Sequence, residues 1–136
     1  MREFEATFRL AAAFGHADVT SAAAGWVAEA GADTGLLCLQ VVGSTGGITT
    51  IEYEPGALAD LERALEKISP VEGRYRHNER WHDGNGFSHL RSALIGTSLT
   101  VPIRAGALAL GTWQQIAVFN FDNRSRERLL VGLLHG

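Results

Sequence analysis

The second half of the chain is a series of strand-like segments joined by short turns, and this feature limits the possible folds most. One predicted hairpin turns at Arg104–Gly106, and the charged turn Asp122–Arg126 joins the last two segments. A short turn can join only antiparallel neighbours, because parallel strands need a crossover of about a dozen residues or more. The sequence therefore predicts mostly antiparallel pairing. The predicted strands here are residues 99–103, 108–110, 115–121 and 129–134.

The first half alternates between strand and helix patterns. Apolar and polar residues alternate from Glu3 to Leu10, which is typical of a half-buried strand. Gly31 supplies a helix stop and Pro55 a helix start. The pattern predicts an α+β fold with roughly seven strands and two or three helices, in a single domain of residues 1–136. The predicted strands here are residues 4–10, 35–42 and 48–54, and the predicted helices residues 19–30, 55–69 and 88–94.

Composition excludes few functions but sets the class of protein. Hydrophobic residues make up 46% of the 136 residues and charged residues 20%, as in ordinary globular proteins. The net charge of −3 gives no reason to expect nucleic acid or an anionic membrane as a partner. No apolar stretch reaches the roughly 18 residues of a membrane helix, so we expect a cytoplasmic protein. Cys38 lies in an apolar run and is expected to be a small core residue.

The stretch Tyr75–His89 is the most unusual part of the sequence. It contains three of the five histidines, and neither helix nor strand periodicity fits its first ten residues. A long irregular segment in a small domain is more often functional than not. We therefore predict a functional loop here, followed by a short helix.

Two histidines of this stretch are the first candidates for chemistry. His77 and His89 are twelve positions apart, and a loop followed by a helix could bring them together as metal ligands or as an acid–base pair. Zinc normally needs three or four protein ligands, and the available additions are His82, Asp83, Glu52 and Glu54. No spacing among these residues is diagnostic, so the alternative of two surface histidines stays open.

Two further segments have alternative interpretations. The loop Gly43–Gly47 offers backbone amides and two hydroxyl groups that could cradle an anion, or it is a flexible turn between strands. It lacks the Gly-Lys-Ser/Thr ending of a P-loop. Trp113 belongs to the cluster Gly111–Gln115, which combines a hydroxyl, an indole and two amides, and it is expected to lie in the core.

Several segments together resemble the YjbQ-like family of small proteins, whose members are often described as secondary thiamine-phosphate synthases. The likeness runs over nearly the whole chain, and its motifs are specific in order and spacing. They are Ser44–Thr45, Thr49–Gly56, Tyr75–Asn78, Asp83–Leu90, Ile95–Pro102 and Gly106–Ile116.

The resemblance implies two packed sheets and a homotrimer with sites near the subunit interfaces. It also implies a polar pocket with three histidines that serves as a metal or small-anion site. The second and third of these match His77 and His89, and a strand glutamate matches Glu52. The place of the first histidine is taken by Gly43, so one member of the expected trio is missing.

The expected function is that of a protein with an enzyme-like site for a small phosphate-bearing molecule. The expected activity is that of a weak transferase similar to a thiamine-phosphate synthase. His77, His89 and Glu52 are the candidate catalytic residues, and His77 and His89 the candidate ligands of a divalent metal, zinc or magnesium. Alternatives are a non-catalytic module for an anion or metal, or a metal-dependent hydrolase, with the site degenerate at Gly43. The candidate ligand-binding residues are Ser44, Thr45, Gly46, Asn85 and Gln114.

Overall fold

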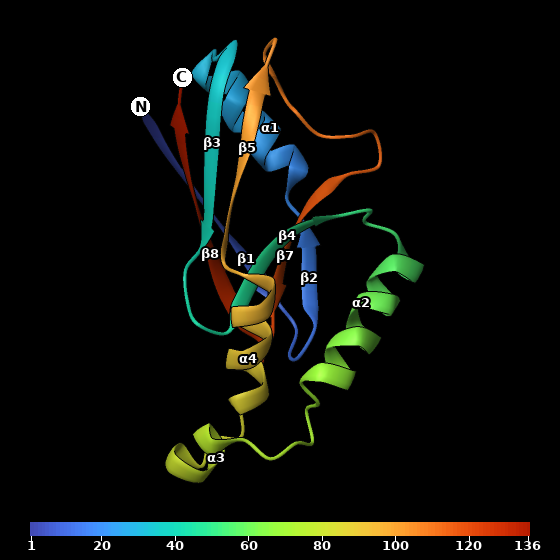
Figure 1. Ribbon diagram of the computed structural model, residues 1–136. Coiled ribbons are helices and arrows are strands. Elements are labelled where there is room, and N and C mark those ends of the chain that lie inside the picture. The colour runs from blue at the N-terminus through green and yellow to red at the C-terminus, as the bar shows by residue number, and fades with distance from the viewer.

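Two antiparallel β-sheets form the frame of the protein in the computed structural model, which describes residues 1–136 (Figure 1). The larger sheet has the order β1 (Arg2–Leu10), β8 (Arg126–His135), β3 (Thr34–Val41), β5 (Ser98–Arg104) and β6 (Ala107–Leu108). The smaller sheet has the order β2 (Gly15–Asp18), β7 (Gln115–Asn120) and β4 (Gly46–Ile51). The predicted α+β class with antiparallel strands in two sheets is confirmed.

Four helices complete the domain, and their ends follow local sequence signals. They are α1 (Thr20–Ala30), α2 (Pro55–Ile68), α3 (Arg76–Trp81) and α4 (Gly86–Ile95). Gly31 ends α1 in the left-handed conformation with φ of 63°. The Glu54 carboxylate caps α2 by accepting hydrogen bonds from the amides of Gly56 and Ala57. Figure 1 shows α3 and α4 at the end of the molecule opposite both chain termini.

The main core lies between the five-stranded sheet, the three-stranded sheet and α1. Along β3 the side chains alternate strictly, so that Leu37, Leu39 and Val41 are buried. Trp26 of α1 stacks on Phe4 with ring centroids 5.4 Å apart, which places it against this core as expected. A second cluster of buried side chains packs under α2.

Several local predictions were wrong. Residues Arg76–Trp81 form helix α3, although the sequence predicted a loop. The prediction failed because none of the six residues is buried, so no apolar stripe marks the helix in the sequence. The four-residue strand β2 was not predicted, and β4 ends at Ile51 because Glu54 already caps the following helix. The protein thus has eight strands and four helices.

Two side chains expected in the core are exposed. Cys38 points to the outer face of the large sheet, and Trp113 is 71% exposed in the loop between β6 and β7. Apolar character alone does not tell which face of a sheet is covered. No helix of the structure is long and apolar enough to cross a membrane.

Candidate functional site

The junction between α3 and α4 brings His77 and His89 together. Their imidazole rings lie with centroids 4.4 Å apart and planes inclined at 42°. The predicted proximity of the two histidines is therefore a feature of the fold, and their chemical role stays a prediction.

Asn78 and Gly86 hold this junction. The side-chain oxygen of Asn78 accepts a hydrogen bond from the Gly86 amide at 2.8 Å, which fixes the start of α4 against α3. A Cβ atom at position 86 would lie 2.4 Å from the Cβ atom of Tyr75, so only glycine allows this approach. The polar stretch thus contains structural residues as well as candidate functional ones.

Asp83 is the carboxylate that reaches the histidine pair. Its Oδ1 atom lies 3.4 Å from Nδ1 of His77. The Asn85 amide, oriented with its nitrogen toward the same carboxylate, donates at 3.0 Å. His82, the other suggested substitute for the missing histidine, lies in a separate hollow with Asn78 and Glu79. Asn85 therefore contacts Asp83, which in turn contacts His77.

A hollow of about 420 Å³ opens on the other side of His89. Ser44 comes from the loop after β3, and Ser92 from the same face of α4 as His89. The remaining lining residues are Gly43, Ala93, Gly96 and Thr97. Hydroxyl groups, backbone and one imidazole thus surround the space, a lining suited to a small polar ligand rather than an apolar one.

Thr45 and Gly46, the next residues of the loop, are buried. The Thr45 hydroxyl accepts a hydrogen bond from Arg128 and lies 3.1 Å from the Asp122 carboxylate, to which it donates. Gly46 begins β4, and a Cβ atom there would lie 2.8 Å from the Val41 side chain. Their predicted contact with a ligand is untested, and their side of the loop packs inward.

Sequence reasoning missed the buried polar network beneath this loop. Arg128 donates from Nε and Nη2 to Oδ1 of Asn120, at 3.2 and 2.7 Å. The Asn120 amide donates to backbone oxygens of Leu10, Ala11 and Arg124. The available signal was Arg128 itself, a charged residue at an inward-facing position of the alternating strand β8.

Burial and hydrogen bonding act oppositely on the carboxylate of this network. Burial raises the pKa of Asp122, but hydrogen bonds from the Asn123 amide, Arg126 and Thr45 outweigh burial and lower it overall. Arg126 donates to Asp122 at 2.8 Å. Burial also lowers the pKa of Arg128. The positive charge of Arg126 lowers this pKa further, whereas the negative charge of Asp122 raises it.

Glu52 and Gln114 lie at the far end of the small sheet. The first residue of β4, Gly46, pairs with Asn120, and its last, Ile51, pairs with Gln115. Five residues of strand separate these ends by about 17 Å. Gln114 contacts Thr50 there, at 3.0 Å, and Glu52 is exposed. Within one chain these two predicted site residues are not brought to the histidine pair.

The side chains of one chain do not complete a metal site. No group of three or more His, Cys, Asp or Glu side chains is arranged to hold a metal ion. Zinc takes three or four protein ligands, whereas His77 and His89 supply two nitrogens and Asp83 contacts only one of the rings. The predicted divalent metal therefore does not fit the residues present in a single chain.

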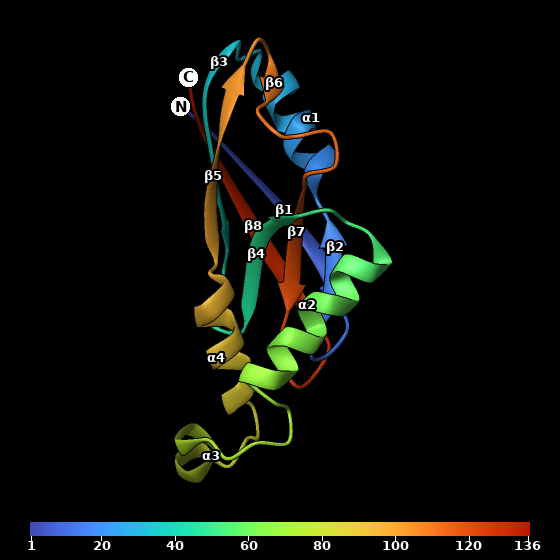
Figure 2. The same cartoon turned by 45° about the vertical axis from the view of Figure 1, so that its right-hand side comes forward.

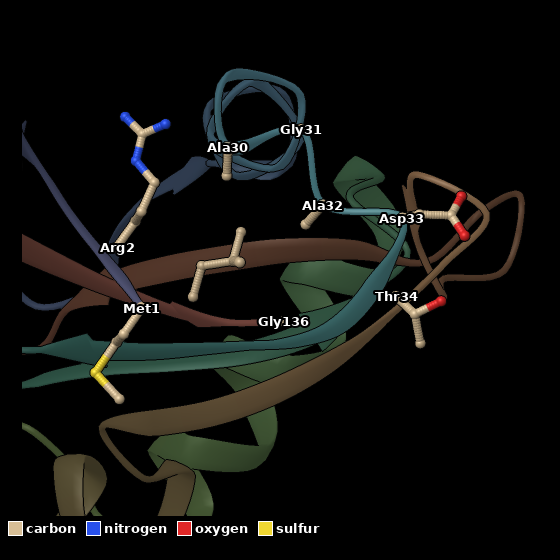
Figure 3. Close-up of a pocket in the computed structure, with 9 residues that line it drawn as sticks. Met1, Arg2, Ala30, Gly31, Ala32, Asp33, Thr34 and Gly136 are labelled. Carbon is tan, nitrogen blue, oxygen red and sulfur yellow. The ribbon is translucent and has the colours of Figure 1, made fainter.

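The hollow near the chain termini has a different character. It measures about 490 Å³ and lies between the end of α1 and the ends of β1 and β8. Figure 3 shows the charged ends of Arg2 and Asp33 pointing in different directions, so they do not converge on one ligand. It contains no histidine. The hollow beside His89 is the better candidate site.

Comparison with known proteins identifies the family of the chain. The family model described as "UPF0047 protein YjbQ-like" matches residues 5–136. The chain belongs to the YjbQ-like UPF0047 family. A UPF0047 protein of Methanothermobacter thermautotrophicus is 38% identical over 85% of this chain and 80% of its own. The YjbQ protein of Salmonella typhimurium is 34% identical over 76% and 75%.

Solved structures of YjbQ-like proteins have the same fold. A hypothetical protein from Aeropyrum pernix K1 superimposes with a TM-score of 0.92 at 30% identity, covering 100% of this chain and 99% of the other. An uncharacterised YjbQ/UPF0047 protein from Clostridium acetobutylicum gives 0.88 at 30% identity, covering 97% and 99%. These relatives are described as hypothetical or uncharacterised, so the likeness supports the family and fold and brings no activity with it.

Position 43, where the family resemblance implies a histidine, has an unusual backbone conformation. Gly43 has φ of 129°, a conformation that side chains rarely adopt. A Cβ atom there would lie 2.9 Å from Nη1 of Arg128. The glycine is thus matched to the local backbone and to the arginine below it.

Proposed function

We propose that this YjbQ-like protein binds a small phosphate-bearing molecule in the hollow between His89 and the Gly43–Ser44 turn. The observation that supports this most is the histidine pair, 4.4 Å between ring centroids, opening beside a hydroxyl-lined space. An anion in that space would stabilise positive charge on both rings. The exposed hydroxyl of Ser44 and the backbone of the turn would donate hydrogen bonds to its oxygens.

In an enzymatic version, the histidines provide acid–base chemistry. His89 borders the hollow and is the residue that can exchange a proton with a ligand there. His77 lies behind it, and Asp83 at 3.4 Å orients the His77 ring and stabilises its charged form. The reaction we propose to test first is weak thiamine-phosphate formation, the transfer that the family resemblance suggests.

The test for binding uses nuclear magnetic resonance of the histidine side chains during titration with inorganic pyrophosphate. We expect the His77 and His89 signals to shift together, whereas His135, at the other end of β8, serves as an internal control. The His89→Ala variant should lose saturable binding. Equal, non-saturating shifts of all histidines would overturn the proposal.

The test for catalysis uses purified protein, Mg²⁺, a pyrimidine pyrophosphate and a thiazole phosphate. Product above that of the His77→Ala/His89→Ala variant would support the transferase. Binding without turnover would instead support the non-catalytic module. Elemental analysis of the same sample tests the divalent metal and the hydrolase alternative, which both need close to one ion per chain.

We also propose that the protein is a homotrimer in which the far end of the small sheet serves a neighbouring copy. Glu52, Gln114 and the largely exposed Trp113 gather at that end, distant from the histidines of their own chain. The outer face of the large sheet is also apolar at Leu36 and Leu133, and Figure 2 shows no helix over that side of β3 and β5.

Mixing variants tests this arrangement. Glu52→Ala and His89→Ala proteins, each inactive in the proposed site, should regain part of the binding or activity when unfolded and refolded together. Light scattering should give three chains per particle. A monomer, or no complementation between the two variants, would contradict the shared site.

A further inference from the structure

We propose that Arg128 is an anion-binding residue of the hollow beside Gly43, so that the hollow selects a doubly charged oxyanion such as a phosphate monoester group. This inference rests on the proposed function, because it assigns the charged group of the ligand to the same site. It also explains how an anion is held where the family pattern places a histidine.

The first observation is a buried charge without a direct counter-ion. Arg128 is only 6% exposed, yet it forms no ion pair. Its hydrogen-bond acceptors, Asn120 and Thr45, are neutral, and Asp122 is reached only through the Thr45 hydroxyl and pairs with Arg126. A buried guanidinium with neutral partners is costly, and an anion beside it would offset that cost.

The second observation is an open donor group. Nε and Nη2 of Arg128 donate within the protein, but Nη1 has no acceptor there. The one fully buried side-chain atom without a partner is Oγ of Ser88, so Nη1 of Arg128 is still reached by solvent. The hydrogen bonds of Nε and Nη2 account for a role of the guanidinium in holding the loop. They leave Nη1 available to donate to a ligand.

The third observation is the direction of this group. Nη1 lies 2.9 Å from the place where a Cβ atom of residue 43 would stand. Gly43 has no side chain and lines the hollow with Ser44 and His89. Arg128 is not itself a lining residue, but the glycine leaves the space next to Nη1 free of a residue-43 side chain. Arginine is well suited to such a position because its planar donors match the oxygens of a phosphate group.

Calorimetric titration with inorganic sulfate separates this site from a site made of histidines alone. Sulfate keeps its double charge from about pH 6 to about pH 9, whereas histidine side chains generally lose theirs near pH 6.5. An arginine stays charged throughout. The native protein should therefore bind sulfate at both pH values, with affinities that differ by less than about tenfold.

Two variants and one control complete the experiment. Arg128→Lys keeps a charge but removes Nη1, and it should weaken sulfate binding at least about tenfold at both pH values. Arg124→Lys changes an exposed arginine of the nearby turn and should leave the affinity within about twofold. Gly43→Ala places a methyl group against Nη1 and should weaken binding as Arg128→Lys does.

The outcomes separate the two proposals. Sulfate binding by the native protein that Arg128→Lys leaves unchanged would overturn the role of Arg128 and leave the proposed function standing. Absence of any sulfate or phosphate binding by the native protein would overturn both. Should Arg128→Lys fail to fold, unchanged binding by folded Gly43→Ala would overturn the role of Arg128, and the expected loss would support it.

Discussion

The polar network beneath the Gly43–Gly47 turn and the histidine pair at the α3–α4 junction are both rich in polar side chains, but they are built differently. Asn120 and Asp122 are fully buried, and each has several hydrogen bonds to side chains or backbone. His77 and His89 are half-buried, and the pair has a single carboxylate contact, from His77 to Asp83 at 3.4 Å. The network holds the fold, and the pair is free to meet a ligand.

Arg128 lies at the boundary between these two regions. Two of its nitrogens belong to the network, and the third, Nη1, lies next to Gly43, which lines the hollow. We therefore predict that substitutions in the network cause large losses of stability and that substitutions of the histidine pair cause small ones. For ligand binding we predict that the histidine substitutions have the larger effect. The predictions below can break that division.

The largest loss of stability is expected for Asn120→Ala. This change removes the Asn120 hydrogen bonds to the buried Arg128 guanidinium and to three backbone oxygens, so the free energy of unfolding should fall by about 3 to 5 kcal/mol. Urea denaturation measures it. Asn123→Ala, which alters an exposed amide three positions away, is the matched control and should cost less than about 1 kcal/mol. Similar losses for the two variants would contradict a special role of the network.

Two glycine-to-alanine substitutions should change the free energy of unfolding in opposite directions. Gly43→Ala forces a side chain into φ of 129° and against Arg128, which should destabilise the protein by about 1 to 3 kcal/mol. Gly25→Ala, in helix α1 with open space around it, should stabilise it by about 0.5 to 1 kcal/mol. The same denaturation assay compares them. A neutral Gly43→Ala would mean that the turn relaxes easily and that Arg128 is not confined by it.

Acid should weaken the network through Asp122. The pKa of this carboxylate is lowered in the folded protein, so its contribution to stability is present above the unfolded value of about 3.9 and is lost as pH falls through the folded value. Unfolding midpoints measured from about pH 5 down to about pH 2 should fall less steeply for Asp122→Asn than for the native protein. Parallel curves for the two proteins would contradict the shift.

The smallest loss of stability is expected for the histidines. His77→Ala and His89→Ala should each change the free energy of unfolding by less than about 1 kcal/mol, because both side chains are half-buried and have few partners. His89→Ala should nonetheless remove pyrophosphate binding. A loss of several kcal/mol would show that the pair is a structural element instead.

Much of the fold could be predicted from the sequence, because the alternation in β1, the stop signal at Gly31 and the start signal at Pro55 act locally. Helix α3 could not, since none of its residues is buried and its contact with the following helix is the hydrogen bond from Gly86 to Asn78. Likewise, Cys38 and Trp113 are apolar or aromatic but lie on faces that nothing in this chain covers.

The candidate site was predictable only in part. His77 and His89 stood out by residue type, and the structure brings them together. Glu52 and Gln114 stood out equally, but they lie at the other end of the small sheet. Glu52 follows the last residue of β4 and Gln114 precedes the first residue of β7, where these two strands pair. Arg128 was not recognised, because its hydrogen bonds to Asn120 depend on how the two sheets meet and not on any local motif.

The central claim, that the hollow beside His89 and Gly43 holds an oxyanion, is tested most directly by a crystal structure grown with tungstate. This heavy analogue of phosphate can be located by its anomalous scattering. We predict one strong site per chain within hydrogen-bond distance of Ser44, His89 and Nη1 of Arg128. A hollow without tungstate, or an ion held by the nitrogens of His77 and His89 at metal-ligand distances of about 2.1 Å, would contradict it.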